Sequence, residues 1–366
     1  MPARVCLIVN PAAGGGRAGR AAPACERALR GHGLQLRRED TRGLQHAREL
    51  AGAAADLGET VVALGGDGLI GAIADRLRER PRAVLGIIPG GRGNDLARVL
   101  GIPEDAEAAA EIIAAGHTLA LDLGFVEELG GAGGGARRSQ LGGAGGGARR
   151  SQADGAGGAQ PAGAREPGRD SPGRAFVGIA SAGFDSDANR IANEAPARLG
   201  QLVYVYGALR ALLAWRAARF QIELEPPGER HTYTGFSVGA ANSKAYGGGM
   251  WAAPDALLDD GLLEVVLVED MSRLAFLTKI LPKVFKGTHV HEPGVHVFRA
   301  RELVLEADRP FTMYADGDPI GQLPVRVRAL PAAITMLTPA SREPLTPSAP
   351  GSAFGARARP AASAPG

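Results

Sequence analysis

The chain has 366 residues, of which 45% are hydrophobic and 22% charged, with a formal net charge of +2. This length and composition predict two globular domains with sizeable cores. A charge so close to zero argues against nucleic acid as the main partner. The chain has only two cysteines, Cys6 and Cys25, which is not the pattern of a protein held together by disulfides. We therefore expect the protein in the reducing cytoplasm.

The sequence contains no pattern typical of a signal peptide or a membrane span. The longest apolar stretch, residues 202–215, is interrupted by Gly207 and Arg210 and is too short to cross a bilayer.

Residues 4 to about 122 alternate between short apolar runs and segments with helical character. The runs at 5–9, 60–64 and 84–88 each end in a Gly-rich turn. Short buried strands between helices are typical of a parallel α/β sheet, which binds ligands beyond the carboxyl ends of its strands. We therefore assign residues 1–122 to an α/β nucleotide-binding domain.

Residues 126–174 differ from both neighbouring regions. Residues 129–140 are repeated directly at 141–152, and the remainder is rich in Gly, Ala, Pro and Arg. Such a composition buries too little apolar surface to offset its ordering entropy, so we predict a disordered insertion. An arm that grips anionic lipid through its Arg pairs is the alternative. The tail, 339–366, is rich in Pro, Ala and Ser and is also predicted to be disordered.

Residues 175–338 have a mainly β pattern, and many short strands with turn signals predict a β-sandwich. Two helices are expected within it, near 198–218 and 272–286. The predicted strands are 175–180, 221–225, 233–240, 262–268, 295–298, 302–306, 311–314, 325–327 and 333–337.

The first chemical motif is Gly65-Gly66-Asp67-Gly68, directly after a predicted strand. Glycines let backbone N–H groups approach phosphate oxygens, and an acidic residue among them can hold Mg²⁺ or accept a proton. The plain alternative is a tight turn in which Asp67 caps the next helix.

Two further Gly-rich segments, 10–16 and 89–95, follow predicted strands in the same way. In the second, Arg92 could contact phosphates, while Asn94 and Asp95 could cap the following helix. A helix cap alone is the alternative. Three such turns on one sheet edge favour a nucleotide-phosphate site over ordinary connections.

These motifs resemble those of the diacylglycerol, sphingosine and ceramide lipid kinases, and the bacterial diacylglycerol kinase branch in particular. The resemblance implies an N-terminal α/β domain like those of phosphofructokinase and NAD kinase, a C-terminal β-sandwich, and an active site between them. The implied activity is transfer of the γ-phosphate of ATP to a lipid hydroxyl, with diacylglycerol as the leading substrate. The C-terminal segments that carry the resemblance are 183–185, Asn242, 246–250, 253–254, 259–263 and 316–318.

The resemblance also assigns ATP contacts to individual residues, and the reading of the 89–95 motif adds Arg92 and Asn94. The contacts implied by the family are Asn10, Pro11, Ala12, Ala13, Gly14, Thr41, Gly65, Gly66, Asp67, Gly68, Leu69, Ile70 and Gly71. The catalytic base would be Asp67, as in sphingosine-kinase-like members, or Asp318, as in bacterial members.

Metal and substrate residues are implied in the same way. A structural Mg²⁺ would be held by Asp260 and by the flanking carbonyls of Leu257 and Leu262, since oxygen ligands suit this ion. Asp185 or Asp187 matches the region that holds the lipid head group. ATP and Mg²⁺ are thus the expected cofactors.

The chain departs from the family pattern at four positions. Leu69 and Arg92 stand where the family has Thr, and Ala72 and Asp318 stand where it has Glu. Two hydroxyls that contact phosphate are therefore absent, although Arg92 could replace one with a charge-assisted contact.

Three alternatives to diacylglycerol phosphorylation remain open at this point. They are a sphingosine-like or other lipid substrate, an NAD kinase-like enzyme, and a catalytically weakened nucleotide- or lipid-binding regulator. The C-terminal motifs between 247 and 263 argue against the NAD kinase. Peripheral contact with the inner face of the membrane is expected, and a homodimer is left open. Lys279, Lys283 and Lys286 share a helical spacing typical of a solvated face, which could also meet an anionic membrane.

Overall fold

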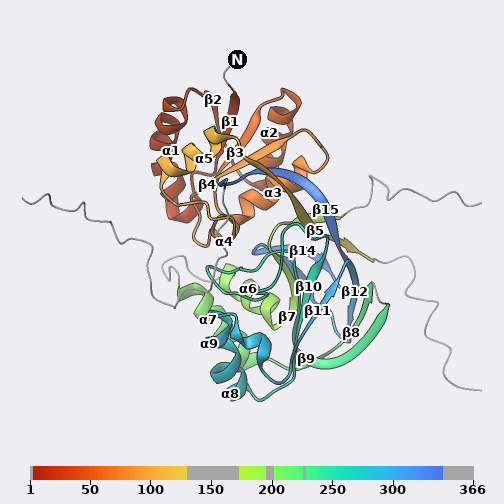
Figure 1. Cartoon of the computed structure of the whole chain (residues 1–366). Helices are drawn as coiled ribbons and strands as arrows, with labels where there is room; N and C mark the ends of the chain where they lie inside the picture. Colours follow the sequence, from red (N-terminus) through yellow and green to blue (C-terminus); the bar gives the residue numbers. More distant parts are fainter. Residues whose placement is uncertain (1–2, 130–172, 195–201, 226–227, 341–366) are drawn as a thin grey trace, which may run out of the picture.

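The computed structural model describes residues 3–129, 173–194, 202–225 and 228–340 (Figure 1). The N-terminal domain alternates strands and helices, as the sequence predicts. Its elements are β1 (Arg4–Val9), α1 (Ala13–Gly31), β2 (Gln35–Asp40), α2 (Leu44–Asp56), β3 (Thr60–Gly65), α3 (Asp67–Leu77), β4 (Val84–Pro89), α4 (Asp95–Val99) and α5 (Ala106–Ala115).

The N-terminal sheet is parallel, in the order β4-β3-β1-β2. The strands predicted at 5–9, 60–64 and 84–88 are confirmed as β1, β3 and β4, and each is almost entirely buried. Helices cover both faces of such a sheet, which explains the continuous apolar runs. Because β1, β3 and β4 are neighbours and run the same way, their Gly-rich ends lie at one edge.

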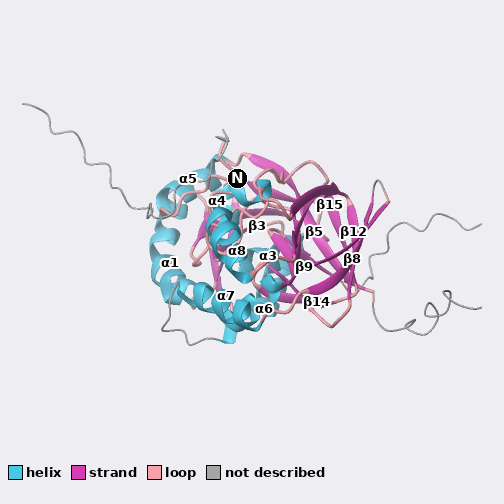
Figure 2. Ribbon diagram, turned by 90° about the horizontal axis from the view of Figure 1, so that it is seen from below, coloured by secondary structure: helices cyan, strands magenta, loops and turns pink. Residues whose placement is uncertain are grey.

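The C-terminal part begins with the long strand β5 and consists mainly of antiparallel strands. Its elements are β5 (Thr118–Glu128), β6 (Arg174–Phe176), β7 (Ile179–Gly183), α6 (Phe184–Glu194), α7 (Leu202–Ala214), β8 (Ala218–Glu225), β9 (Glu229–Ala241), β10 (Leu263–Glu269), α8 (Arg273–Ala275), η2 (Phe276–Ile280), α9 (Leu281–Val284), η3 (Thr288–His291), β11 (Val295–Ala300), β12 (Glu302–Ala307), β13 (Thr312–Ala315), β14 (Asp318–Gln322) and β15 (Val325–Leu337). Figure 2 shows the helices gathered on one side of the molecule and these strands on the other.

The predicted fold class, an α/β domain followed by a β-sandwich, is confirmed. The sandwich strands run in the order β14-β13-β7-β9-β8-β12-β15, with β10 and β11 added beside β9 and with β5 and β6 beside β15. Two predicted strands, 325–327 and 333–337, are the two ends of the single strand β15.

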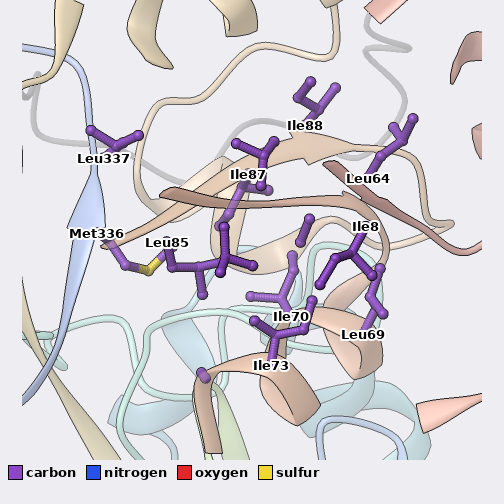
Figure 3. Close-up of a cluster of buried hydrophobic side chains, with 14 of the residues drawn as sticks. Ile8, Leu64, Leu69, Ile70, Ile73, Leu85, Ile87, Ile88, Met336 and Leu337 are labelled. Carbon is purple, nitrogen blue, oxygen red and sulfur yellow. The ribbon is translucent and has the colours of Figure 1, made fainter. Parts of the chain in front are cut away.

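Strand β15 joins the two sheets. Its first half pairs with β12, and its last residues pair in parallel with β4, where Met336 lies opposite Leu85. Figure 3 shows the Met336 side chain beside Leu85 in the N-terminal core. Antiparallel pairing of β15 with β5 along nearly its whole length reinforces this connection. The two domains are therefore held together by continuous backbone hydrogen bonding.

The helices of the C-terminal domain differ in part from the predicted ones. The helix expected near 198–218 is described as α7, and β8 begins at Ala218, so the expected range was too long at its end. The helix expected near 272–286 is a composite of α8, η2 and α9. Helix α6 was not predicted.

The described residues contain no helix that combines the length and apolar character needed to cross a bilayer. Strand β5 runs to Glu128 and β6 begins at Arg174, so most of the predicted insertion and of the predicted tail lies outside the described residues.

Candidate active site

The three Gly-rich turns meet at the carboxyl ends of β1, β3 and β4. The backbone N–H of Asn10 donates to the carbonyl of Leu64 at 3.1 Å, and that of Gly90 donates to the carbonyl of Gly65 at 2.8 Å. A Cβ placed on Gly91 would lie 2.3 Å from the Cα of Gly66, a clash no side chain can avoid. Glycine is therefore required for the turns to pack backbone against backbone.

The first turn continues into a run of left-handed backbone. Gly14, Gly15 and Gly16 have φ values of +60°, +69° and +86°. A Cβ on Gly14 would lie 2.6 Å from the carbonyl oxygen of Gly90, so this run also approaches the third turn. Concave backbone of this kind, at the start of a helix, is suited to binding anions.

Three arginines surround these turns, and the sequence reasoning identified only one of them. The Nη1 atom of Arg20 donates to the carbonyl of Gly15 at 3.4 Å, and Arg17 packs beside Gly14 while it pairs with Glu104. Arg92 is exposed, and no hydrogen bond or ion pair is recorded for it in the described part of the chain. Arg17 follows the three glycines directly and Arg20 lies one turn of α1 later. This spacing from the Gly-rich turn could have indicated both residues from the sequence.

Several residues predicted to bind ATP have side chains that bond or pack within the protein instead of facing a ligand. The Thr41 hydroxyl donates to the carbonyl of Gly43 at 2.7 Å. Leu69 is 2% exposed and lies with Ile70 in the core, as Figure 3 shows, so these two residues could reach a nucleotide only through their backbone.

The predicted side-chain cap at Asn94 is wrong. Asn94 precedes α4 in the left-handed conformation, and its Oδ1 accepts from the N–H of Gly91 at 2.8 Å instead of capping the helix. Its Nδ2 donates to Glu104 at 2.9 Å. Asn94 therefore fixes the shape of the third turn, because a short polar side chain tolerates this conformation and bonds locally.

A cavity of about 80 Å³ lies between the third turn and the C-terminal domain, and three carboxylates line it: Asp67, Asp95 and Asp316. Asp67 begins α3, and its Oδ1 accepts from the N–H of Leu96 at 3.1 Å. Burial and the negative charge of Asp67 raise the pKa of Asp95.

Asp316 comes from the tight turn between β13 and β14. Its carboxylate accepts from the N–H groups of Val177 at 2.9 Å and Gly178 at 2.8 Å. Burial raises the pKa of Asp316 to about 7 and the charge of Asp67 adds to the rise, although the two N–H groups oppose it. A carboxyl group with such a pKa can exchange a proton near neutral pH.

Asp318 does not line this cavity. Its Oδ2 would lie 3.2 Å from a Cβ on Gly68, so it packs against the start of α3. Burial raises the pKa of Asp318, while the positive charges of Arg174 and Arg48 oppose the rise. The sequence reasoning thus named Asp67 and Asp318 but did not assign a catalytic role to Asp95 or Asp316, although both stand in motifs that it quoted.

An apolar pocket of about 180 Å³ adjoins the acidic cavity. The two share Ile179, Asn189, Tyr246 and Gly247 in their walls. Most of the remaining wall is apolar and comes from α6, β10, η2 and α9. The pocket can therefore hold a hydrocarbon chain whose polar end reaches the carboxylates.

Asp185, the predicted substrate residue, lies in the wall of this apolar pocket. Burial raises the pKa of Asp185 to about 6, and a hydrogen bond with Ser237 opposes the rise. A carboxyl group in apolar surroundings is costly unless a partner reaches it, so Asp185 is placed to meet a polar group of a ligand.

The predicted metal residues lie in the turn before β10. Asp260 Oδ1 accepts from the N–H of Leu262 at 3.0 Å, and Oδ2 forms an ion pair with Arg299. Leu257 is exposed, and the described residues contain no group of three or more acidic, His or Cys side chains that could hold a metal ion. Each oxygen of the Asp260 carboxylate thus has one partner within the protein. The metal assignment stays a prediction.

Comparisons with known proteins match two separate parts of the chain to two family models. Residues 4–126 match a family model described as the diacylglycerol kinase catalytic domain, and residues 178–338 match one described as the YegS C-terminal NAD kinase beta sandwich-like domain. A diacylglycerol kinase of Mycobacterium tuberculosis is 29% identical over 339 residues, which cover 92% of this chain and 95% of that protein.

Two further comparisons extend the likeness. A probable lipid kinase, YegS-like, of Serratia proteamaculans is 28% identical over 294 residues, which cover 78% of each chain. A solved diacylglycerol kinase structure from Bacillus anthracis superposes with a TM-score of 0.62 at 18% identity, covering 92% of this chain and 97% of that one. At this identity the structural match supports the fold alone.

Proposed function

Because the chain belongs to the diacylglycerol kinase family of lipid kinases, we propose that it transfers the γ-phosphoryl group of ATP to a hydroxyl of a diacylglycerol-like lipid. The observation that carries this proposal is the junction of the apolar pocket with the acidic cavity beside the Gly-rich turns. A lipid chain in the pocket would present its hydroxyl to the carboxylates, with the nucleotide on the other side.

The Gly-rich turns are the proposed nucleotide site. The left-handed backbone of Gly14, Gly15 and Gly16 at the start of α1 is suited to phosphate oxygens, and Arg17, Arg20 and Arg92 supply positive charge around the turns. Phosphoryl transfer depends mainly on positioning and on stabilising the charge of the transferred group. Magnesium would arrive as MgATP, and it would neutralise part of the phosphate charge.

Asp67 is the proposed base. In the reaction, the lipid hydroxyl gives its proton to the carboxylate, its oxygen forms a bond to the γ-phosphorus, and the bond from the γ-phosphorus to the bridging oxygen of ADP breaks. Asp67 is favoured over Asp318 because it lines the cavity that meets the lipid pocket. Asp95 and Asp316 would hold the cavity in shape and share its negative charge.

A sphingosine-like substrate is the second candidate, and Asp185 is the observation that favours it. A carboxyl group in the wall of the lipid pocket could pair with an amine that diacylglycerol lacks. With diacylglycerol, Asp185 would instead meet a hydroxyl. We further propose that the chain works at the cytoplasmic face of a membrane, where both ATP and lipid are accessible.

A lipid panel tests the function directly. The purified chain would be incubated with γ-labelled MgATP and detergent-dispersed diacylglycerol, monoacylglycerol, ceramide or sphingosine, and with NAD as a control acceptor. Label is expected in phosphatidic acid. Label in NAD would contradict the proposal, and absence of transfer to every lipid would favour a binding protein that has lost catalysis with the Thr hydroxyls at positions 69 and 92.

A further inference from the structure

Figure 1 shows α7 and the segment with α8 and α9 at the end of the C-terminal domain that lies away from the N-terminal domain, and both contribute residues to the wall of the apolar pocket. Ala208 of α7 lines the pocket from one side, and Phe276, Leu281 and Phe285 line it from the segment that contains η2 and α9. The Nη2 atom of Arg273 donates to the carbonyl of Trp215 at 3.0 Å and ties the two elements together. Phe285 lines the pocket and is also exposed, so the pocket reaches the surface here.

Both elements expose large apolar side chains, and Tyr206 and Leu213 of α7 do so beside Arg190, Ile191 and Glu194 of α6. Leu213 and Leu274 are 73% and 70% exposed, which is unusual for leucines on a compact protein. Positions 274, 277, 281 and 285 follow a helical spacing of three to four, so they form a stripe that leads from the exposed tip of the segment to the pocket wall. The other exposed members of the set are Tyr206, Leu209 and Leu277. An exposed apolar patch of this kind marks a binding surface.

The same two elements carry positive charge. Helix α7 contains Arg210, residues 271–291 contain one Arg and three Lys, and neither contains Asp or Glu. Lys283 pairs with Glu292, but no ion pair neutralises Arg210, Lys279 or Lys286 in the described part of the chain. The whole chain has a net charge of only +2, whereas the charged residues of these two elements are all positive.

We propose that this surface, formed by Tyr206, Leu209, Leu213, Leu274 and Leu277 with Arg210, Lys279 and Lys286, docks on an anionic lipid bilayer; we call it the docking face. This proposal rests on the proposed function, since the docking face would be the place where a lipid substrate leaves the bilayer and enters the pocket. Leucines at the tip enter the interfacial region, and the Lys and Arg side chains reach the charged head groups. Each such cation near an anionic surface strengthens the attraction to it.

A second copy of the chain fits this surface less well. A two-fold interface would bury the leucines, but it would also bring Lys279 and Lys286 against the same positive surface of the partner. Like charges placed together oppose association, whereas an anionic bilayer satisfies the leucines and the cations at once.

Vesicle sedimentation of the full chain, without ATP, tests the charge component. Vesicles of phosphatidylcholine alone would be compared with vesicles that also contain phosphatidylglycerol. The chain is expected to bind the anionic vesicles, and Lys279→Glu/Lys286→Glu is expected to weaken binding at least about tenfold. The matched control is Arg27→Glu/Arg82→Glu, which makes the same charge change on the exposed surface of the N-terminal domain. Equal loss in the control, or no loss in the first variant, would overturn the proposal.

The apolar component is tested with Leu213→Ser/Leu274→Ser, and Leu57→Ser is the control because Leu57 is an exposed leucine of the N-terminal domain. Only the double variant should lose vesicle binding. Conversion of a dimer to a monomer by that variant, measured by sedimentation velocity, would overturn the proposal in favour of a self-interface.

Phosphoryl transfer to detergent-dispersed lipid separates this proposal from the proposed function. All docking-face variants should keep that activity, since none of the substituted residues lines the pocket. Activity without vesicle binding would overturn the docking face alone. Vesicle binding that depends on these residues, without any activity, would uphold the docking face and contradict the proposed function.

Discussion

The carboxylate of Asp95 accepts a hydrogen bond of 2.8 Å from the backbone N–H of Gly248, across 153 positions of sequence. Asp95 begins α4 in the N-terminal domain. Gly248 belongs to a run of three glycines with positive φ in the C-terminal domain, where residues with side chains would be strained. This contact therefore sets how the wall of the lipid pocket approaches the Gly-rich turns.

Asp95→Ala should lower both stability and activity. The substitution leaves the N–H of Gly248 and the Nη1 atom of Arg98 without their acceptor, which costs about 1–3 kcal/mol of the free energy of unfolding. Urea denaturation would measure the first effect, and turnover with diacylglycerol, expected to fall about a hundredfold or more, the second. Asp270→Ala is the control, because Asp270 is exposed in the C-terminal domain. Unchanged turnover would remove Asp95 from the site.

Arg92→Ala should raise the apparent KM for ATP roughly tenfold, because a charge-assisted hydrogen bond contributes about 1.5–3 kcal/mol. The KM for the lipid should change little, and Arg92→Thr, which carries the family residue, should recover part of the loss. Arg82→Ala, at another exposed position of the same domain, should leave both values unchanged. If Arg92→Ala has the wild-type KM for ATP, the missing hydroxyl is not compensated by this arginine.

Replacement of residues 130–172 by a short Gly-Ser linker should preserve activity on detergent-dispersed lipid, because their composition cannot build a core. The limits of the deletion matter. Val126 is buried and pairs with Arg174 between β5 and β6, and Glu128 accepts from the N–H of Gln322 at 2.7 Å. Removal of 126–174 should therefore lower the melting temperature while removal of 130–172 should not. A large loss of melting temperature with the shorter deletion would show that the segment packs.

Stability should fall as pH rises from about 4 to 7, and Asp185→Asn should reduce that fall. The folded chain holds the proton of Asp185 up to about pH 6, whereas the unfolded chain releases it near pH 4. The folded state therefore binds more protons in this window, and its advantage is lost as pH rises through it. Urea denaturation at pH 4.5 and pH 7 would measure the difference, with Asp270→Asn as the control. An identical fall in wild type and Asp185→Asn would show that Asp185 titrates normally.

The parts of the fold that the sequence predicted are those with a strong local signal. Strands β1, β3 and β4 are apolar runs bounded by glycines, and all three were found. Strand β2 was missed because its sequence, residues 35–40, is polar, and only the structure shows why this is tolerated. It lies at the edge of the sheet, where Arg37 pairs with Glu59 and Arg38 pairs with Asp40.

The site was predictable in its motifs but not in its assembly. The sequence and the family resemblance indicated Asp67 and the Gly-rich turns, because their pattern is local. The approach of Asp316 to Asp67 depends on how β13 and β14 pack against the N-terminal domain, and that of Asp95 depends on the contact between α4 and the start of α3. No local pattern encodes either contact. Leu69 illustrates the same limit, since its packing in the core could not be distinguished from a position facing the nucleotide.

The central claim, that carboxylates at this junction activate a lipid hydroxyl for attack on ATP, is tested most directly with Asp67→Asn. This isosteric change removes the charge and the proton-accepting capacity while it keeps an acceptor for the N–H of Leu96. Transfer of label from γ-labelled MgATP to diacylglycerol should fall at least about a hundredfold with an unchanged melting temperature. Near-normal transfer by the folded Asp67→Asn variant would contradict the account.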